Sequence, residues 1–171
     1  MAKNKPEPVQ VIKQRRDAAL AKLGASIPYV TYMGIQFERR GDELTAILPF
    51  RDDLVGNPFL PALHGGATAA FLEVSCVFEL TWSTVWEAIE TGVMSPDEIA
   101  IGQNLTMPKT IDFTVDYLRS GLPRDAYARA VVNRSGRRYA SVSVEAWQDN
   151  RSRLFAKASG HFIIPDIKTD T

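Results

Sequence analysis

The stretch Leu63–Glu73, LHGGATAAFLE, opens a long and mostly apolar segment of this chain. His64 and the two glycines after it stand where a helix would begin. The first N–H groups of a helix have no partner within it, and the helix dipole adds partial positive charge there. Such a helix start is suited to hold a developing negative charge.

Glu73 lies between two and three turns further along the expected helix. At the helical period it is about 160° round from Ser75 and about 120° from Glu79. Its own face carries small or apolar side chains: Ala69, Ala70, Cys76, Val77 and Leu80. A carboxylate on a buried face is costly unless it is paired or used in chemistry. The pattern alone leaves two interpretations open, a catalytic carboxylate behind a functional turn or a structural glutamate paired with an arginine.

Composition narrows the class of protein. The chain has 171 residues, 45% of them hydrophobic, with twenty basic and twenty acidic side chains. The length fits one folded unit with a sizeable core, and the balanced charge argues against a general nucleic-acid or membrane-surface role. A lone cysteine excludes an internal disulfide, and we expect Cys76 to be a small buried hydrophobe. Without a leader or an apolar run of ~18 residues, we expect a cytoplasmic protein with no membrane segment.

Periodicity predicts the order of the elements. Apolar residues at helical spacing from Pro8 to Leu23 predict an N-terminal helix that stops at Gly24. The central helix is expected from about Gly66 into the 81–89 region, and Ser95–Glu98 has the form of a capping box that starts a short helix. The expected strands are 33–37, 44–48, 109–118, 127–133, 139–147 and 154–164, with a turn at 39–42. This pattern indicates an α+β fold, an antiparallel sheet wrapped round one long central helix, with an N-terminal helix in front.

The ordered set of motifs resembles the hotdog-fold acyl-CoA thioesterases of the phenylacetate-degradation type. The resemblance rests on Asn57-Pro58, on His64-Gly65-Gly66, on an acidic residue nine positions after the histidine and on the strand 110–119, TIDFTVDYLR. It covers roughly residues 35–164. The expected division is a tail and helix at 1–24, the hotdog thioesterase domain at 25–165 and a tail at 166–171.

The resemblance implies hydrolysis of an acyl-CoA or aryl-CoA to the free acid and CoA, with no metal and no cofactor. Backbone N–H groups of Gly65 and Gly66 would polarise the thioester carbonyl. Glu73 would activate water or attack the carbonyl directly, and the sequence does not choose between them. The remaining implied site residues are Thr110, which helps to hold the water, Asn57, and His64, which braces the turn. Most relatives carry aspartate where this chain has Glu73.

The family builds each site from two subunits, so the resemblance implies a homodimer and leaves open a pairing of dimers. It also places Arg119, Arg137 and Arg138 near the CoA phosphates, although solvated turn arginines would look the same. A second set, Trp82, Trp86, Met94 and Met107, fits an acyl pocket and simple core packing equally well.

Rival chemistries lack their motifs. No Gly-x-Ser-x-Gly elbow, phosphate-binding loop or His-Glu-x-x-His zinc helix is present. His161 shares its expected strand face with Lys157 and Ser159, so we expect it at the surface. Two other classes of function stay open: an acyl-CoA binding or sensing protein without catalysis, and a structural hotdog subunit with no small ligand.

Overall fold

The computed structural model of the protein describes residues 7–41, 43–101 and 103–165. Residues 1–6 and 166–171 of the expected tails lie outside the described residues, and so does Asp42 of the expected 39–42 turn. Six strands pair antiparallel in one sheet of order β1-β2-β4-β5-β6-β3. Their bounds are β1 Gln36–Arg40, β2 Glu43–Leu48, β3 Lys109–Tyr117, β4 Ala126–Ser135, β5 Tyr139–Trp147 and β6 Ala156–Ile163. The α+β architecture expected from the sequence is confirmed.

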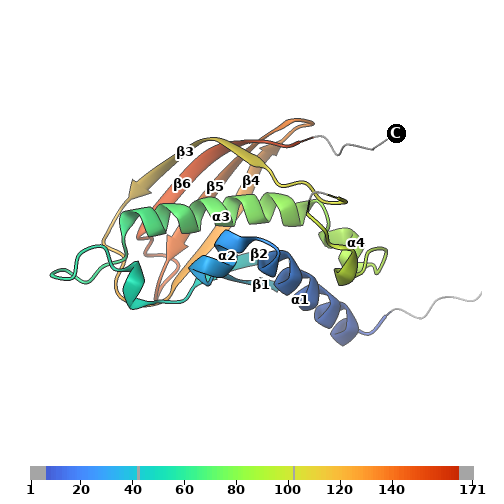
Figure 1. The fold of residues 1–171 in the computed structure, drawn as a ribbon, viewed down its shortest axis with the longest axis horizontal. Coiled ribbons are helices and arrows are strands. Elements are labelled where there is room, and N and C mark those ends of the chain that lie inside the picture. Colours follow the sequence, from blue (N-terminus) through green and yellow to red (C-terminus); the bar gives the residue numbers. More distant parts are fainter. Residues whose placement is uncertain (1–6, 42, 102, 166–171) are drawn as a thin grey trace, which may run out of the picture.

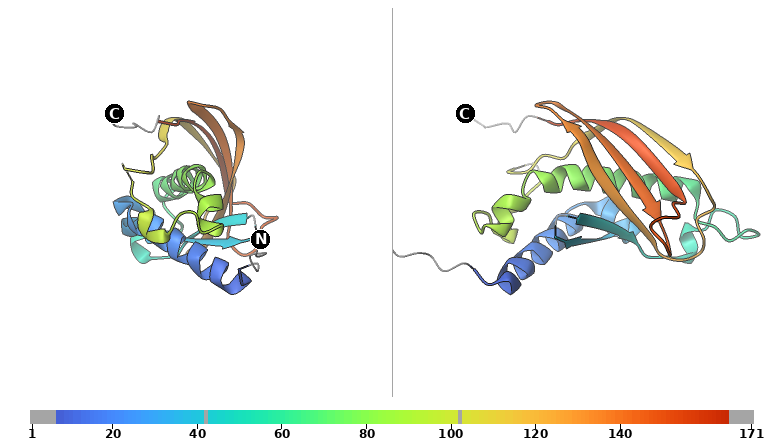
Figure 2. Two further views of the ribbon diagram at one scale, coloured as in Figure 1. Left: turned by 90° about the vertical axis from the view of Figure 1, so that its right-hand side faces the viewer. Right: turned by 180° about the vertical axis from the view of Figure 1, so that it is seen from behind.

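The long helix α3, Gly65–Ser83, lies in the concave side of this sheet (Figure 1). Seen end-on, strands curve round it, with β1 and β2 passing beneath it (Figure 2, left). Small side chains on the inner face of the strands allow this close approach. Those that are completely buried are Ala126, Ala128, Ala140, Ala146 and Ala156. The helix fills the space above them with large side chains.

Apolar side chains of α3 pack against the sheet. Phe71, Leu72 and Cys76 are fully buried and belong to the main core between helix and strands. Burial of one such large apolar side chain stabilises the fold by roughly 1.5–3 kcal/mol. A helix with a face this apolar can form only when the sheet covers it.

A second core joins the C-terminal half of α3 to α1, Val9–Ala25, and α4, Trp86–Glu90. Trp82 is buried in it, and Trp86 and Met94 pack against it, so these three side chains serve core packing. Buried Arg39 ties the second core to β1. Its Nε lies 3.2 Å from Glu90 Oε1, and its guanidinium stacks 4.5 Å from the centre of the Trp86 ring.

The structure corrects two boundaries predicted from the sequence. Gly24 is a helical residue of α1, which ends one residue later. The predicted strand at 33–37 is wrong at its start, because α2, Pro28–Met33, occupies the preceding residues and β1 begins at Gln36. The central helix ends at Ser83, within the 81–89 region expected for its end.

The predicted capping box is present. It opens a single 3-10 turn, η2, at Pro96–Glu98, and another such turn, η1, covers Asp52–Leu54. Within the described ranges, no helix is both long and apolar enough to cross a membrane.

Candidate active site

The turn before α3 is fixed by backbone hydrogen bonds to two distant segments. Leu63 N–H donates to Gly121 O at 2.8 Å, and His64 N–H donates to Leu54 O at 2.7 Å. His64 is the N-cap residue of α3, and its Nδ1 accepts the Gly66 N–H at 2.9 Å. Because a backbone N–H can only donate, Nδ1 is the unprotonated ring nitrogen and Nε2 carries the proton. His64 therefore caps the start of the helix.

The two glycines have different surroundings. The Gly66 N–H is taken by His64, and a Cβ at Gly66 would come within 3.0 Å of the His64 ring. The Gly65 N–H has no hydrogen-bond partner among the described residues, and a Cβ there would meet only Tyr117, at an ordinary 3.5 Å. Internal packing thus explains the glycine at 66 but not the one at 65. Of the two N–H groups proposed from the sequence, that of Gly65 is the one free to bind a ligand oxygen.

Two residues that the sequence did not single out complete this turn. Tyr117, the last residue of β3, donates its hydroxyl hydrogen to Gly65 O at 2.8 Å. At Gly56 a Cβ would lie 2.8 Å from His64 Cδ2, so the missing side chain makes room for the imidazole. The Tyr117 contact joins segments that are distant in the sequence, and the Gly56 contact depends on the position of the His64 ring. No local sequence pattern predicts either contact.

Glu73 and Thr110 are brought together across the helix–sheet interface. Thr110 Oγ1 donates to Glu73 Oε1 at 2.6 Å. Glu73 is not fully buried, contrary to the expectation from its helical face. It lies at the rim of α3, where this hydroxyl is its hydrogen-bond partner.

A β-bulge between Thr110 and Asp112 sets the direction of Thr110. Strict alternation would put Thr110 on the same face as Asp112, which points outward and pairs with His161. The extra residue reverses the alternation, and Thr110 faces the helix instead. Gly160 makes space opposite the bulge, because a Cβ there would lie 2.6 Å from Phe113 Cδ2 and 2.9 Å from Asp112 O.

The two halves of the candidate site lie apart within one chain. Gly65 and Glu73 are eight residues apart on α3, about 12 Å along the helix axis at 1.5 Å per residue. Tyr117 and Thr110 contact them from opposite ends of β3. A single thioester carbonyl cannot reach both the Gly65 N–H and the Glu73 carboxylate of the same chain.

Asn57 lies in the loop that precedes the turn. Its Oδ1 accepts the Phe59 N–H at 3.0 Å, and the loop is closed by a bond from Gly56 N–H to Ala62 O. The Asn57 side-chain oxygen is thus used within its own loop.

The three arginines assigned to CoA phosphates do not form one cluster in the chain. Arg119 follows β3 at the end of the sheet where Tyr117 pairs with Ala156. Arg137 and Arg138 lie in the turn between β4 and β5, at the opposite end of these strands. At that end Ile163 of β6 pairs with both Tyr139 and Lys109. Seven residues of β5 separate the two ends, about 23 Å at 3.3 Å per residue.

Other chemistry-bearing side chains lie away from these contacts. Cys76 is fully buried, and burial raises the pKa of its thiol, so it is an inert hydrophobe as expected. The ring of His161 is only half-buried, packs on Tyr139 and pairs with Asp112 at 2.9 Å. No group of three or more His, Cys, Asp or Glu side chains in the described part of the chain could hold a metal ion.

Glu79 is a second carboxyl of α3 and faces β1, β2 and β4. It lies in a small void with Phe37, Ala46, Ser75 and Ala128. Burial raises the pKa of Glu79 to about 7, and the Arg39 guanidinium opposes this shift. The carboxyl therefore binds a proton in the folded protein at a pH where an exposed glutamate would have lost it.

Stability is expected to fall as the pH rises from about 4.5 to about 7, because the folded state holds the Glu79 proton and the unfolded state releases it. The shift corresponds to about 3 kcal/mol between the two ends of this window. Denaturant unfolding of Glu79→Gln and wild type at pH 5 and pH 8 checks it. The variant should gain stability relative to wild type at pH 8, whereas the exposed Glu87→Gln control should not. A difference between Glu79→Gln and wild type that is the same at both pH values contradicts the expectation.

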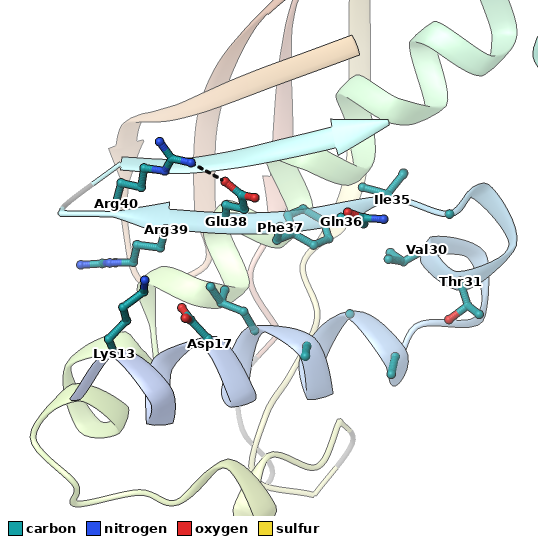
Figure 3. A pocket seen from close by; sticks show the side chains of 15 residues that line it. Lys13, Asp17, Val30, Thr31, Ile35, Gln36, Phe37, Glu38, Arg39 and Arg40 are labelled. Atoms are coloured by element: carbon teal, nitrogen blue, oxygen red, sulfur yellow. Dashed lines mark hydrogen bonds and ion pairs between the residues drawn. The ribbon is translucent and has the colours of Figure 1, made fainter. Parts of the chain in front are cut away.

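A groove of about 620 Å³ lies between α1 and β1 (Figure 3). Charged side chains of both signs gather at one end, among them Lys13, Asp17 and Arg39, and apolar Val30 and Ile35 line the other end. None of the residues assigned to catalysis lies in its lining. The candidate active site is therefore the α3–β3 rim and not this groove.

Comparison with known proteins places the chain among thioesterases. The family model of the Thioesterase superfamily matches residues 60–154, which include the α3 turn, Glu73 and β3. Over 141 residues the chain is 33% identical to the medium/long-chain acyl-CoA thioesterase YigI of Escherichia coli (strain K12), covering 81% of this chain and 86% of that protein.

Solved structures agree on the fold. A protein of Chromobacterium violaceum aligns with a TM-score of 0.62 and 31% identity, over 94% of this chain and 100% of that one. A phenylacetic acid degradation-related protein of Ralstonia eutropha aligns with a TM-score of 0.63 and 19% identity, over 86% of this chain and 99% of that one.

Proposed function

The chain belongs to the thioesterase superfamily, and from this premise we propose that it hydrolyses medium- to long-chain acyl-CoA thioesters to the free acid and CoA. The observation that carries the proposal is the Glu73 carboxylate, held by Thr110 at the partly exposed rim of α3. The substrate class comes from YigI, which is named for medium- and long-chain acyl-CoA.

In the proposed reaction Glu73 acts as general base. Thr110 occupies Oε1, so Oε2 takes a proton from water while the water oxygen attacks the thioester carbonyl carbon. The oxyanion that forms accepts the Gly65 N–H at the positive end of α3. Collapse of the tetrahedral intermediate breaks the C–S bond, and the proton held by Glu73 leaves with the CoA thiolate. Nucleophilic attack by Glu73 through a mixed anhydride is the alternative route.

We further propose that two copies of the chain share each site. One copy alone keeps Gly65 and Glu73 about 12 Å apart. The described residues leave β3 as an unpaired edge of the sheet, with exposed apolar Ile111 and Leu118 on or beside it. A two-fold axis along this edge brings the helix start of one copy to the Glu73 of the other, as isologous dimers allow.

The same arrangement supports a shared site for the CoA phosphates. Arg119 lies at the Gly65 end of its chain, and Arg137 and Arg138 lie at the Glu73 end. The dimer would bring Arg119 of one copy near the other two arginines of the second copy. Guanidinium groups bind phosphate well because their N–H donors form a planar fork.

The test is hydrolysis of a panel of short, medium, long and aryl acyl-CoAs, with the released thiol detected. We expect turnover to be greatest for the medium and long chains. Binding of CoA in a thermal-shift assay without any thiol release would support a sensing protein instead. No release and no shift would favour a structural subunit.

A further inference from the structure

The peptide group between Gly65 and Gly66 is held at both of its polar ends. Its carbonyl accepts the Tyr117 hydroxyl at 2.8 Å, and its N–H donates to His64 Nδ1 at 2.9 Å. Because a peptide unit is planar and rigid, two such bonds fix its rotation about the chain. The preceding peptide carries the Gly65 N–H, so its direction depends on this anchor.

We propose that Tyr117 is a positioning residue of the oxyanion site: its hydroxyl fixes the Gly65–Gly66 peptide and so aims the Gly65 N–H. This inference rests on the proposed thioesterase function. Tyr117 touches the carbonyl of the turn and not the reacting atoms, so it acts through Gly65.

The packing of the ring supports this role. The Tyr117 ring atoms lie 3.5–3.6 Å from the position of a Cβ on Gly65, so the ring covers one side of that residue. Four residues after Tyr117, Gly121 O accepts the Leu63 N–H on the other side of His64. The end of β3 and the loop after it therefore hold the turn both before and after the N-cap.

The folded core does not account for a tyrosine here. Tyr117 is 55% exposed and sits at the end of an edge strand. A single hydrogen bond at such an exposed position contributes little to the stability of the fold. Its geometric effect on catalysis can be larger, because misplacement of a site by ~1 Å can cost 10²-fold in rate.

The experiment compares Tyr117→Phe with Tyr139→Phe. Tyr139 lies on the same sheet and is 44% exposed, and its hydroxyl has no hydrogen-bond partner among the described residues. Tyr139→Phe therefore removes one hydroxyl, as Tyr117→Phe does, but breaks no hydrogen bond. Tyr117→Phe is expected to lower kcat ~10-fold and to change KM less than ~2-fold, since substrate contacts stay in place. Tyr139→Phe should leave both constants at the wild-type value, and both variants should elute and melt like wild type.

Amide hydrogen exchange gives a second measurement that does not need turnover. Tyr117→Phe should speed exchange of the Gly66 N–H, and Tyr139→Phe should not. Wild-type kcat in Tyr117→Phe, or unchanged exchange at Gly66, overturns the positioning role while leaving the thioesterase function intact. A fall in kcat that merely follows a lower melting temperature also overturns it. Wild-type protein that releases no thiol from any acyl-CoA shows instead that the proposed function has failed.

Discussion

Replacing Glu73 with alanine is expected to lower kcat for acyl-CoA hydrolysis at least ~100-fold, since general-base assistance contributes ~10²–10⁴. Glu73→Gln should lose as much, because the amide keeps the shape and the Thr110 contact but cannot take a proton from water. The measurement is thiol release under saturating substrate, with the melting temperature and elution volume of each variant recorded alongside.

Glu79→Gln is the matched control for this loss. Glu79 lies on the same helix, six residues on, but faces β1, β2 and β4 rather than Thr110. Its kcat should stay within about twofold of wild type, because no group assigned to the reaction touches it. If Glu73→Ala keeps more than about a tenth of the wild-type kcat, the carboxylate is not the base of this reaction.

The spacing from His64 to Glu73 could be read from the sequence because helix geometry is local. An N-cap, two small residues and a helical period are enough to place Glu73 along and around α3. The start of α3 near Gly66 and the α+β fold were predicted correctly on this ground. The position of Glu73 on α3 could therefore be predicted from short-range rules alone.

The direction of Thr110 could not be derived from the same rules. The alternation of Thr110 with Asp112 predicts a shared face, and only the bulge separates them. The bulge depends on Gly160, nearly fifty residues later, where no Cβ obstructs the strand. The resemblance to a family placed Thr110 in the site, whereas strand periodicity would have placed it outside.

Contacts between distant segments explain why Tyr117 and Gly56 were missed. Tyr117 reaches a carbonyl 52 residues earlier in the chain, and Gly56 matters only because the His64 ring packs on it. The missed helix α2 is different, since its signals are local. Pro28 stands at its first position and Gly34 ends it at φ 70°, but residues 33–37 also have the pattern of a strand, which hides the helix.

The second large effect expected is recovery of activity on mixing two inactive variants, Gly65→Val and Glu73→Ala. Valine at Gly65 would add a branched side chain next to the free N–H and against Tyr117, so we expect this variant to lose the oxyanion donor. In a mixed dimer with shared sites, the intact Gly65 of one copy meets the intact Glu73 of the other. Random exchange makes half of the dimers mixed with one good site of two, so recovery should approach about a quarter of wild-type activity.

The reciprocal mixture sharpens the test. A chain carrying both substitutions, mixed in equal amount with wild type, disables both sites of every mixed dimer if the sites are shared. Activity should then fall to about a quarter of that of the same total protein as wild type, against about a half if each chain builds its own site. Native mass spectrometry of copies that differ in tag length establishes that exchange has occurred. If exchange is proven, no recovery in the first mixture and half activity in the second contradict the shared site. Gly65 and Glu73 would then not act on the same carbonyl, because within one chain they lie about 12 Å apart along the helix.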